Sequence, residues 1–391
     1  MKTDAHPHIQ SENEQFNTGQ VATIAGGHFL HDTFSAFLAP LLPLIIDKLS
    51  LTLTLAGTLT TFTQIPSLLN PFIGYAADKL SLRYFIILAP GITATLMSLI
   101  GIAPSYWALA LLLFLSGISI AMFHAPAPAM IANVSGTRVG KGMSFFMASG
   151  ELGRTIGPII ATAAVSFWGL EGMYRLIVFG WIASLILYLR FRSVEARPAK
   201  RSGFRAMLPM AWRLFAPLAG ITLARNFLIV ALGTFLPTLL NSEGASLWLA
   251  GSALAIYEGA GVVGAFSSGT MSDKLGRKPV LTAAFTASAL LMFVFLNVQG
   301  WMMLPVLILL GFTALAPQPV ILAIVQDHLP QHRALANGLY MAMGFLIRIF
   351  TTIAIGFLGD QVGLRTAFFW SGLIALTAIV GVMLLPNMSE S

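Results

Sequence analysis

The chain contains no cysteine and few charged residues. Of its 391 residues, 9% are charged and 57% are hydrophobic. Without cysteine, the protein has no disulfide bond, no thiolate metal ligand and no cysteine nucleophile. Soluble domains carry about 25% charged residues, so the charges here are too few to cover the surface of a soluble protein of this length. Intrinsic disorder is excluded as well, since it requires low hydrophobicity and high charge. The composition therefore predicts an integral membrane protein that crosses the bilayer several times.

Common catalytic signatures are also missing. The sequence has no phosphate-binding loop of the form G-x-x-x-x-G-K-[ST], which excludes a P-loop ATPase. It has no G-x-S-x-G or H-E-x-x-H motif, and no segment between the apolar runs is long enough to form a catalytic domain. We therefore expect no enzyme activity, no cofactor and no resident metal ion.

Long apolar runs indicate the fold class. A helix needs about 20 apolar residues to cross the hydrocarbon core, whereas strands of a membrane barrel would be short and alternating, and these runs do not alternate. We predict an all-α integral membrane protein with twelve transmembrane helices at approximately residues 21–46, 55–77, 84–103, 106–134, 142–167, 173–192, 214–240, 247–271, 279–298, 302–327, 335–359 and 364–386.

The basic residues indicate the orientation of these spans, because cytoplasmic loops are enriched in Lys and Arg. With the N-terminus inside, sixteen of the 22 Lys and Arg residues fall on the cytoplasmic side and three fall outside. The other three, Arg154, Arg225 and Arg348, lie within predicted spans. We expect a multi-pass protein of the cell inner membrane with both termini in the cytoplasm. The net charge of +7 then reflects topology and not nucleic-acid binding.

The two halves of the sequence resemble each other at an offset of 194 residues. The segment from Gly26 to Pro43 matches the segment from Gly220 to Pro237. The same offset pairs Gly117 with Gly311, Gly150 with Gly344, and Arg154 with Arg348. A single register over five spans predicts two pseudo-symmetric six-helix bundles. The expected organisation is an N-terminal tail at 1–20, a first bundle at 21–192, a basic cytoplasmic linker at 193–213, a second bundle at 214–386 and a C-terminal tail at 387–391.

A related motif follows the second predicted span of each half. Its residues are Gly74, Asp78 and Arg83 in the first half and Gly269, Asp273, Gly276, Arg277 and Lys278 in the second. The second copy resembles the complete signature loop of the major facilitator superfamily, G-x-x-x-D-[RK]-x-G-R-[RK], and the first copy is degenerate. The resemblance implies a transporter of two six-helix bundles, in which this loop latches one conformation of an alternating-access cycle. We expect the second latch to be the stronger; the alternative is a solvated run of charges.

The fifth predicted span contains GELGRTIGP at residues 150–158. It resembles the G-x-x-x-G-P motif that exporters of the superfamily carry in this helix. Small residues such as Gly153 and Gly157 let helices approach closely, and Pro158 bends a helix by removing a backbone hydrogen bond. The motif favours export over import, although the same packing also suits other helical bundles.

Further short motifs resemble one branch of the superfamily. They are GHFLHD at residues 27–32 and PLLP at 40–43 in the first span, and FHAP at 123–126 in the fourth. The fosmidomycin-resistance branch has G-H-x-x-x-D and F-H-P in these places, so this chain differs by the inserted Ala125. The resemblance implies proton-coupled export of small polar or anionic drugs, including phosphonate antibiotics.

Ionisable residues within the predicted spans are candidate site residues, because charge in the membrane is costly and usually marks a transport pathway or a proton site. Guanidinium groups suit carboxylates and phosphonates. We therefore expect substrate binding by Arg154, Arg225, Arg348, His31, His124 and Gln64. Histidine titrates near neutral pH, and burial and neighbouring arginines act in opposite directions on a carboxyl group. We expect proton coupling by Asp32, Glu151, Glu258 and His28, with these groups facing a watery cleft between the halves.

Other interpretations are open for these residues. Glu151 and Arg154 are neighbours on one helix face and could form a structural ion pair, and His124 could bond a carbonyl freed by the nearby proline. The three histidines of the membrane region could bind a transition metal, although their spacing matches no compact metal motif. For the whole protein, the alternatives are an importer or facilitator of a metabolite anion, and a sensor or scaffold without transport. The expected partners are a small-molecule substrate, protons and the lipid bilayer, and a monomer is the default.

Overall fold

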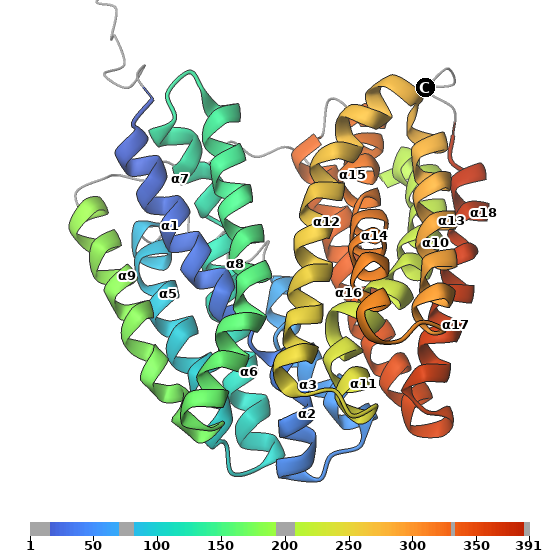
Figure 1. The fold of residues 1–391 in the computed structure, drawn as a ribbon. Helices are drawn as coiled ribbons and strands as arrows, with labels where there is room; N and C mark the ends of the chain where they lie inside the picture. Colours follow the sequence, from blue (N-terminus) through green and yellow to red (C-terminus); the bar gives the residue numbers. More distant parts are fainter. Residues whose placement is uncertain (1–15, 70–81, 193–207, 330–332, 387–391) are drawn as a thin grey trace, which may run out of the picture.

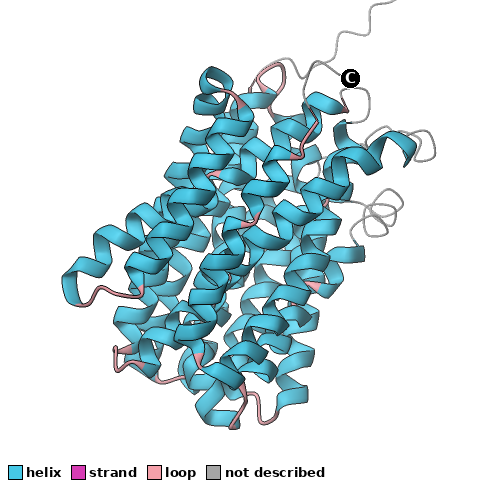
Figure 2. Cartoon of the chain, turned by 90° about the vertical axis from the view of Figure 1, so that its right-hand side faces the viewer, coloured by secondary structure: helices cyan, strands magenta, loops and turns pink. Residues whose placement is uncertain are grey.

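The structure, a computed structural model of the chain, describes residues 16–69, 82–192, 208–329 and 333–386. Within these ranges every regular element is a helix (Figure 2). Ten described helical segments are long and apolar enough to cross a membrane. A helix satisfies its own backbone hydrogen bonds, which lipid cannot do. The structure therefore agrees with an all-α, multi-pass membrane protein.

The first half contains eight described α-helices joined by short 3-10 segments. These elements are α1 (Thr18–Ser35), α2 (Leu38–Leu49), α3 (Leu53–Phe62), η1 (Ile65–Leu69), α5 (Leu82–Ser98), η2 (Ile100–Ile102), α6 (Tyr106–His124), α7 (Ala127–Val134), α8 (Val139–Trp168), η3 (Glu171–Leu176) and α9 (Ile177–Phe191). The 30-residue α8 covers the predicted fifth span, although it is not among the ten described segments that are long and apolar enough to cross a membrane. Its Gly, Ser and charged residues lower its mean hydropathy.

The second half follows the same plan. Its described elements are α10 (Leu208–Val230), the π-helical η4 (Ala231–Phe235), α11 (Leu236–Ser242), α12 (Leu247–Leu275), α13 (Arg277–Phe295), η5 (Gly300–Met302), α14 (Met303–Leu315), α15 (Pro317–His328), α16 (Arg333–Val362), α17 (Leu364–Leu376) and α18 (Ala378–Met383). In the first half, the predicted second span is covered only by α3 and η1, because residues 70–81 lie outside the described ranges. The count of twelve spans and the two-bundle plan therefore stay predictions.

Several predicted spans are interrupted helices, and the interruptions follow the sequence repeat. The first span breaks between α1 and α2, and the corresponding span of the second half is interrupted by η4, one residue from the position that the offset of 194 predicts. The fourth span breaks between α6 and α7, and the tenth between α14 and α15, in both cases beside a proline. Proline removes a backbone donor and disfavours a continuous helix. Apolar length alone did not predict these interruptions.

The two halves lie side by side (Figure 1). Helices α1 to α9 form one side of the molecule and α10 to α18 the other. Helix α1 begins and α18 ends at the upper edge in this view, so the chain enters and leaves on the same side. We call this edge the terminal side and the opposite edge the far side. An even number of membrane crossings follows.

The described contacts between the halves cluster toward the far side. Helix α3 packs on α16, where an added Cβ at Gly57 would lie 2.8 Å from the carbonyl oxygen of Thr352, and one at Gly356 would lie 2.4 Å from that of Leu53. Helices α8 and α12 meet at Gly251, where a Cβ would lie 2.5 Å from the Thr162 side chain. Small residues of this kind let membrane helices approach closely. Toward the far side, a single apolar cluster includes buried residues of both halves, whereas toward the terminal side each half has a separate cluster.

Candidate functional site

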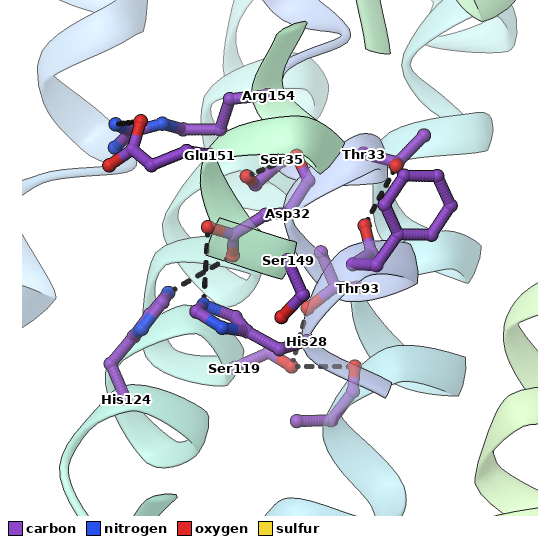
Figure 3. A network of polar contacts seen from close by, with 12 residues as sticks. His28, Asp32, Thr33, Ser35, Thr93, Ser119, His124, Ser149, Glu151 and Arg154 are labelled. Carbon is purple, nitrogen blue, oxygen red and sulfur yellow. Dashed lines mark hydrogen bonds and ion pairs between the residues drawn. The ribbon is translucent and has the colours of Figure 1, made fainter. Parts of the chain in front are cut away.

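A cluster of two histidines and one aspartate, of which His28 and Asp32 are buried, lies in the first half, between α1 and α6 (Figure 3). The Nε2 atom of His28 lies 3.3 Å from Oδ2 of Asp32, and the Nε2 atom of His124 lies 3.2 Å from Oδ1. His28 and Asp32 are one turn apart on α1, and His124 is the last residue of α6. The helix is interrupted at Ala125 and Pro126, between α6 and α7. At this interruption the His124 side chain reaches the Asp32 carboxylate. The fold thus brings together two motifs that are about 90 residues apart in the sequence.

Aromatic rings and one backbone carbonyl position these histidines. The ring of His28 stacks on Phe146 of α8 with centroids 3.9 Å apart, and its Nδ1 is 2.8 Å from the Phe146 carbonyl oxygen. A carbonyl only accepts, so Nδ1 carries the proton in this hydrogen bond. His31 is fully buried and stacks on Phe123 at 4.4 Å. Neither of its ring nitrogens has a hydrogen-bond partner.

Glu151 and Arg154 form an ion pair on α8, next to the Asp32 cluster (Figure 3). The Arg154 side chain is 47% exposed and that of Glu151 27% exposed, so both are accessible. Helix α8 lies close to α1 at Gly153, because glycine has no side chain. A Cβ at this position would be 2.4 Å from the Phe29 carbonyl oxygen. Gly157 packs against Thr33 in the same way, and Pro158 is buried inside α8.

The second half contains a group of arginines with one acid. Arg225 of α10 is buried and donates from Nη1 to Oε1 of Gln318 on α15, at 2.8 Å. Its Nε has no hydrogen-bond partner, and neither has the hydroxyl of the buried Tyr257. Glu258 of α12 lies against η4, where a Cβ at Gly233 would be 3.6 Å from its Oε1. Arg348 of α16 interacts electrostatically with both Glu258 and Arg225.

Glu258 connects the two groups of charges. It interacts electrostatically with Arg154 and Glu151 of the first half and with Arg348 of the second, and Arg154 also interacts with Asp32. The six predicted membrane charges therefore form one connected series across the α8–α12 contact. Cavities of about 640 Å³ between α10 and α17–α18 and about 330 Å³ near the far side are lined by other residues. Gln64 lies between α3 and η1, with its buried Oε1 lacking a hydrogen-bond partner.

The second-half loop motif forms a local charge cluster. Arg277 bonds the Asp273 carboxylate at 2.6 Å and the Ser272 hydroxyl at 2.5 Å, and its Nε donates to Asp327 at 3.3 Å. Gly276 has φ +91°, a conformation that favours glycine. Lys278 donates to the Leu385 carbonyl oxygen at 2.7 Å. These contacts all lie within the second half.

The other described residues of the loop motif, Gly269 and Arg83, lie outside this charge cluster. Gly269 has an open side, with nothing within 4 Å of an added Cβ. Arg83 lies over the Tyr84 ring at 5.0 Å. Gly74 and Asp78 lie outside the described residues, as do most of the 1–20 and 193–213 segments and the 387–391 tail. The latch role of this motif stays a prediction.

Sequence reasoning missed several partners of the candidate site. Gln318 was detectable, because it stands between two prolines in an apolar run and lies 194 residues after His124. By the same offset Arg225 corresponds to His31, so the Arg225–Gln318 hydrogen bond is the counterpart of the His31–His124 ring contact, whose centroids are 5.5 Å apart. The Phe146 carbonyl left no signal, since any residue provides one.

Comparisons with known proteins agree with this architecture. The family model described as Major Facilitator Superfamily matches residues 24–296 and 218–390. The chain is 24% identical over 378 residues to the uncharacterized MFS-type transporter YfnC of Bacillus subtilis, covering 92% of this chain and 91% of that protein. It is 23% identical over 382 residues to the fosmidomycin resistance protein of Escherichia coli, covering 94% and 93%.

Solved structures share the fold. A bacterial homologue of the human lysosomal transporter Spinster, in an inward-facing and occupied conformation, superposes with a TM-score of 0.80 at 15% identity, covering 94% of this chain and 96% of that one. The nucleoside transporter NupG superposes with a TM-score of 0.75 at 16% identity, covering 93% and 99%. At such identities the likeness concerns the fold alone.

Proposed function

The chain belongs to the major facilitator superfamily, and we propose that this secondary transporter is a proton-coupled antiporter that exports small polar or anionic compounds, fosmidomycin-like phosphonates among them. The family and its fold are those of membrane transporters and not of enzymes. The similarity to the fosmidomycin resistance protein and the short motifs of the first and fourth spans support the choice of cargo. From the distribution of basic residues, we place the protein in the inner membrane with both termini in the cytoplasm.

The observation that carries the proposal is the position of Glu258. This acid interacts with Arg154 of the first half and with Arg348 of the second. An anionic cargo competes with Glu258 for these guanidinium groups, because planar donors bind carboxylates and phosphonates in the same way. We assign to Glu258 the proton that is exchanged: the site holds either cargo on the arginines or a proton on Glu258, and the halves alternate with one or the other bound.

The contacts between the halves support alternating access. They join the halves on the far side, while each half keeps its own apolar cluster on the terminal side. With both termini in the cytoplasm, this conformation is closed outward and accessible from within. Cargo would enter from the cytoplasm, and rocking of one half against the other would carry it across.

A reconstituted flux assay tests this proposal. Purified protein in proteoliposomes, with an imposed pH gradient and labelled fosmidomycin, should show flux driven by the gradient and lost in Glu258→Gln. The matched control is Glu243→Gln, which changes an exposed acid paired only with Arg365 on the far side; exposed pairs contribute about 0–1 kcal/mol. Flux that ignores the pH gradient, or that survives Glu258→Gln, contradicts proton coupling. Gradient-independent uptake of metabolite anions that requires Arg225 and Arg348 would instead identify an importer or facilitator.

A further inference from the structure

We propose that His28, Asp32 and His124 form a binding site for a divalent transition-metal ion of the zinc type. One ligand atom from each of the three residues lies within 4.8 Å of the others. Two imidazoles and a carboxylate suit ions such as Zn²⁺, Co²⁺ and Ni²⁺ better than Mg²⁺ or Ca²⁺, which prefer oxygen ligands. Of the three histidines left open as metal ligands from the sequence, His28 and His124 are in this cluster, and Asp32 takes the place of His31.

Two distances in the cluster are close to those between the ligands of a tetrahedral ion. Zinc binds His nitrogen at about 2.0–2.1 Å and carboxylate oxygen at about 2.0–2.2 Å. In a tetrahedron with such bonds, neighbouring ligand atoms are about 3.3 Å apart. The two Nε2 atoms lie 3.3 Å and 3.2 Å from the Asp32 oxygens. Because the two histidines approach different carboxylate oxygens and the ligand atoms lie within 4.8 Å of one another, the side chains must close in by up to about 1.5 Å to reach a tetrahedral arrangement.

The hydrogen bond to Phe146 prepares His28 as a ligand. Because Nδ1 donates to the Phe146 carbonyl at 2.8 Å, the neutral ring presents the lone pair of Nε2 toward Asp32. A lone pair and a carboxylate oxygen at 3.3 Å repel each other unless a cation lies between them. Metal-bound histidines commonly donate their second nitrogen to a carbonyl in this way, which fixes the ring and the tautomer. A proton on His28 is the alternative cation.

Access and stoichiometry follow from the surroundings. The His28 and Asp32 side chains are 4% and 7% exposed, whereas His124 is 37% exposed, so an ion enters past His124. Three protein ligands leave a fourth position for water or another ligand. At the repeat offset, the second half has Thr222, Asn226 and Gln318 instead. These residues provide no imidazole or carboxylate, so we expect one ion per chain.

Zn²⁺ binding to the full-length, tag-free protein in detergent tests the site, by equilibrium dialysis and elemental analysis. The reference protein carries H6Q, H8Q, H328Q and H332Q, which remove every histidine outside the three of the membrane region. We expect one Zn²⁺ per reference chain, with Asp32→Asn and His124→Gln each weakening binding by about tenfold or more. Co²⁺ in the reference protein should give the visible absorption of a tetrahedral complex.

The outcomes are distinct. Saturable binding of one ion that is weakened by about tenfold or more in both variants supports the site. Absence of saturable binding, or binding that either folded variant retains at the affinity of the reference protein, overturns it and leaves the proton as the cation between His28 and Asp32. If a variant elutes as an aggregate, the Co²⁺ spectrum of the reference protein decides, because a spectrum of octahedral, fully hydrated type contradicts the site. The assay uses neither cargo nor flux, so its result is independent of the proposed transport function.

Discussion

The carboxylate of Asp360, at the end of α16, binds the first turn of α3 through Thr54. It accepts hydrogen bonds from the Thr54 backbone N–H at 2.8 Å and the Thr54 hydroxyl at 2.5 Å, and from the Leu53 N–H at 2.7 Å. The first N–H groups of a helix have no partner within the helix, and the positive end of the helix dipole favours an anion there. An acid of one half therefore caps a helix of the other half, on the far side.

Asp360→Asn should weaken closure of the far side. Loss of a helix cap costs about 0.5–2 kcal/mol, which corresponds to a shift of about two- to thirtyfold in the ratio of closed to open molecules. Because the chain has no cysteine, spin labels can be placed without other changes. Labels at the exposed positions Phe167 and Leu249 report on the far side, and we expect longer distances in Asp360→Asn. Asp47→Asn, an exposed acid near the same side, is the control, and an unchanged distance distribution in Asp360→Asn contradicts the cap.

Gly153→Ala should destabilise the protein through the contact of α8 with α1. The new Cβ would lie 2.4 Å from the Phe29 carbonyl oxygen, and overpacking of this kind costs about 1–3 kcal/mol. Gly140→Ala in the same helix has nothing within 4 Å of its Cβ, and alanine is a better helix former than glycine by about 1 kcal/mol. Thermal unfolding in detergent should therefore move in opposite directions for the two variants. Equal shifts would mean that the close approach at Gly153 contributes nothing.

Gln318→Ala should leave a buried charge without its partner. Arg225 is 8% exposed and donates to the Gln318 side chain, and an unsatisfied buried donor costs about 1–3 kcal/mol, more for a charged one. We expect a lower apparent melting temperature than in Gln299→Ala, which changes an exposed glutamine. Gln318→Glu restores an acceptor and should recover the stability. A variant as stable as Gln299→Ala would show that water replaces the lost bond.

The sequence predicted the fold class and family better than it predicted the contacts of the site. Apolar runs require helices in lipid, whatever their partners, and the prediction of an all-helical transporter of this superfamily is confirmed. The repeat offset pairs Arg225 with His31, and it would also have pointed from His124 to Gln318. Asp360 and Thr54, however, are 306 residues apart, and no local pattern links a cap to the helix of another half.

The contacts of Arg277 in the second-half loop also show that the sequence predicts contacts between neighbouring residues better than contacts between helices. Asp273 lies in the last turn of α12 and Arg277 begins α13, on either side of the turn at Gly276, so their ion pair is a contact between residues close in the sequence. Asp327, the other acid that Arg277 contacts, lies on α15, and its position depends on how α13 and α15 pack. The first-half copy of this loop lies mostly at residues 70–81, outside the described ranges. That the second latch is the stronger one therefore stays a prediction.

Proton release on cargo binding tests the competition at Glu258 and the two arginines most directly. In the proposed antiporter the site holds either cargo or a proton, so cargo binding displaces the proton of Glu258, and a weakly buffered solution of purified protein becomes more acidic when fosmidomycin is added. We predict release of about one proton per bound molecule in the wild type and in Glu243→Gln, and none in Glu258→Gln. Saturable fosmidomycin binding with no proton release in the wild type, or with equal release in Glu258→Gln, would contradict the account.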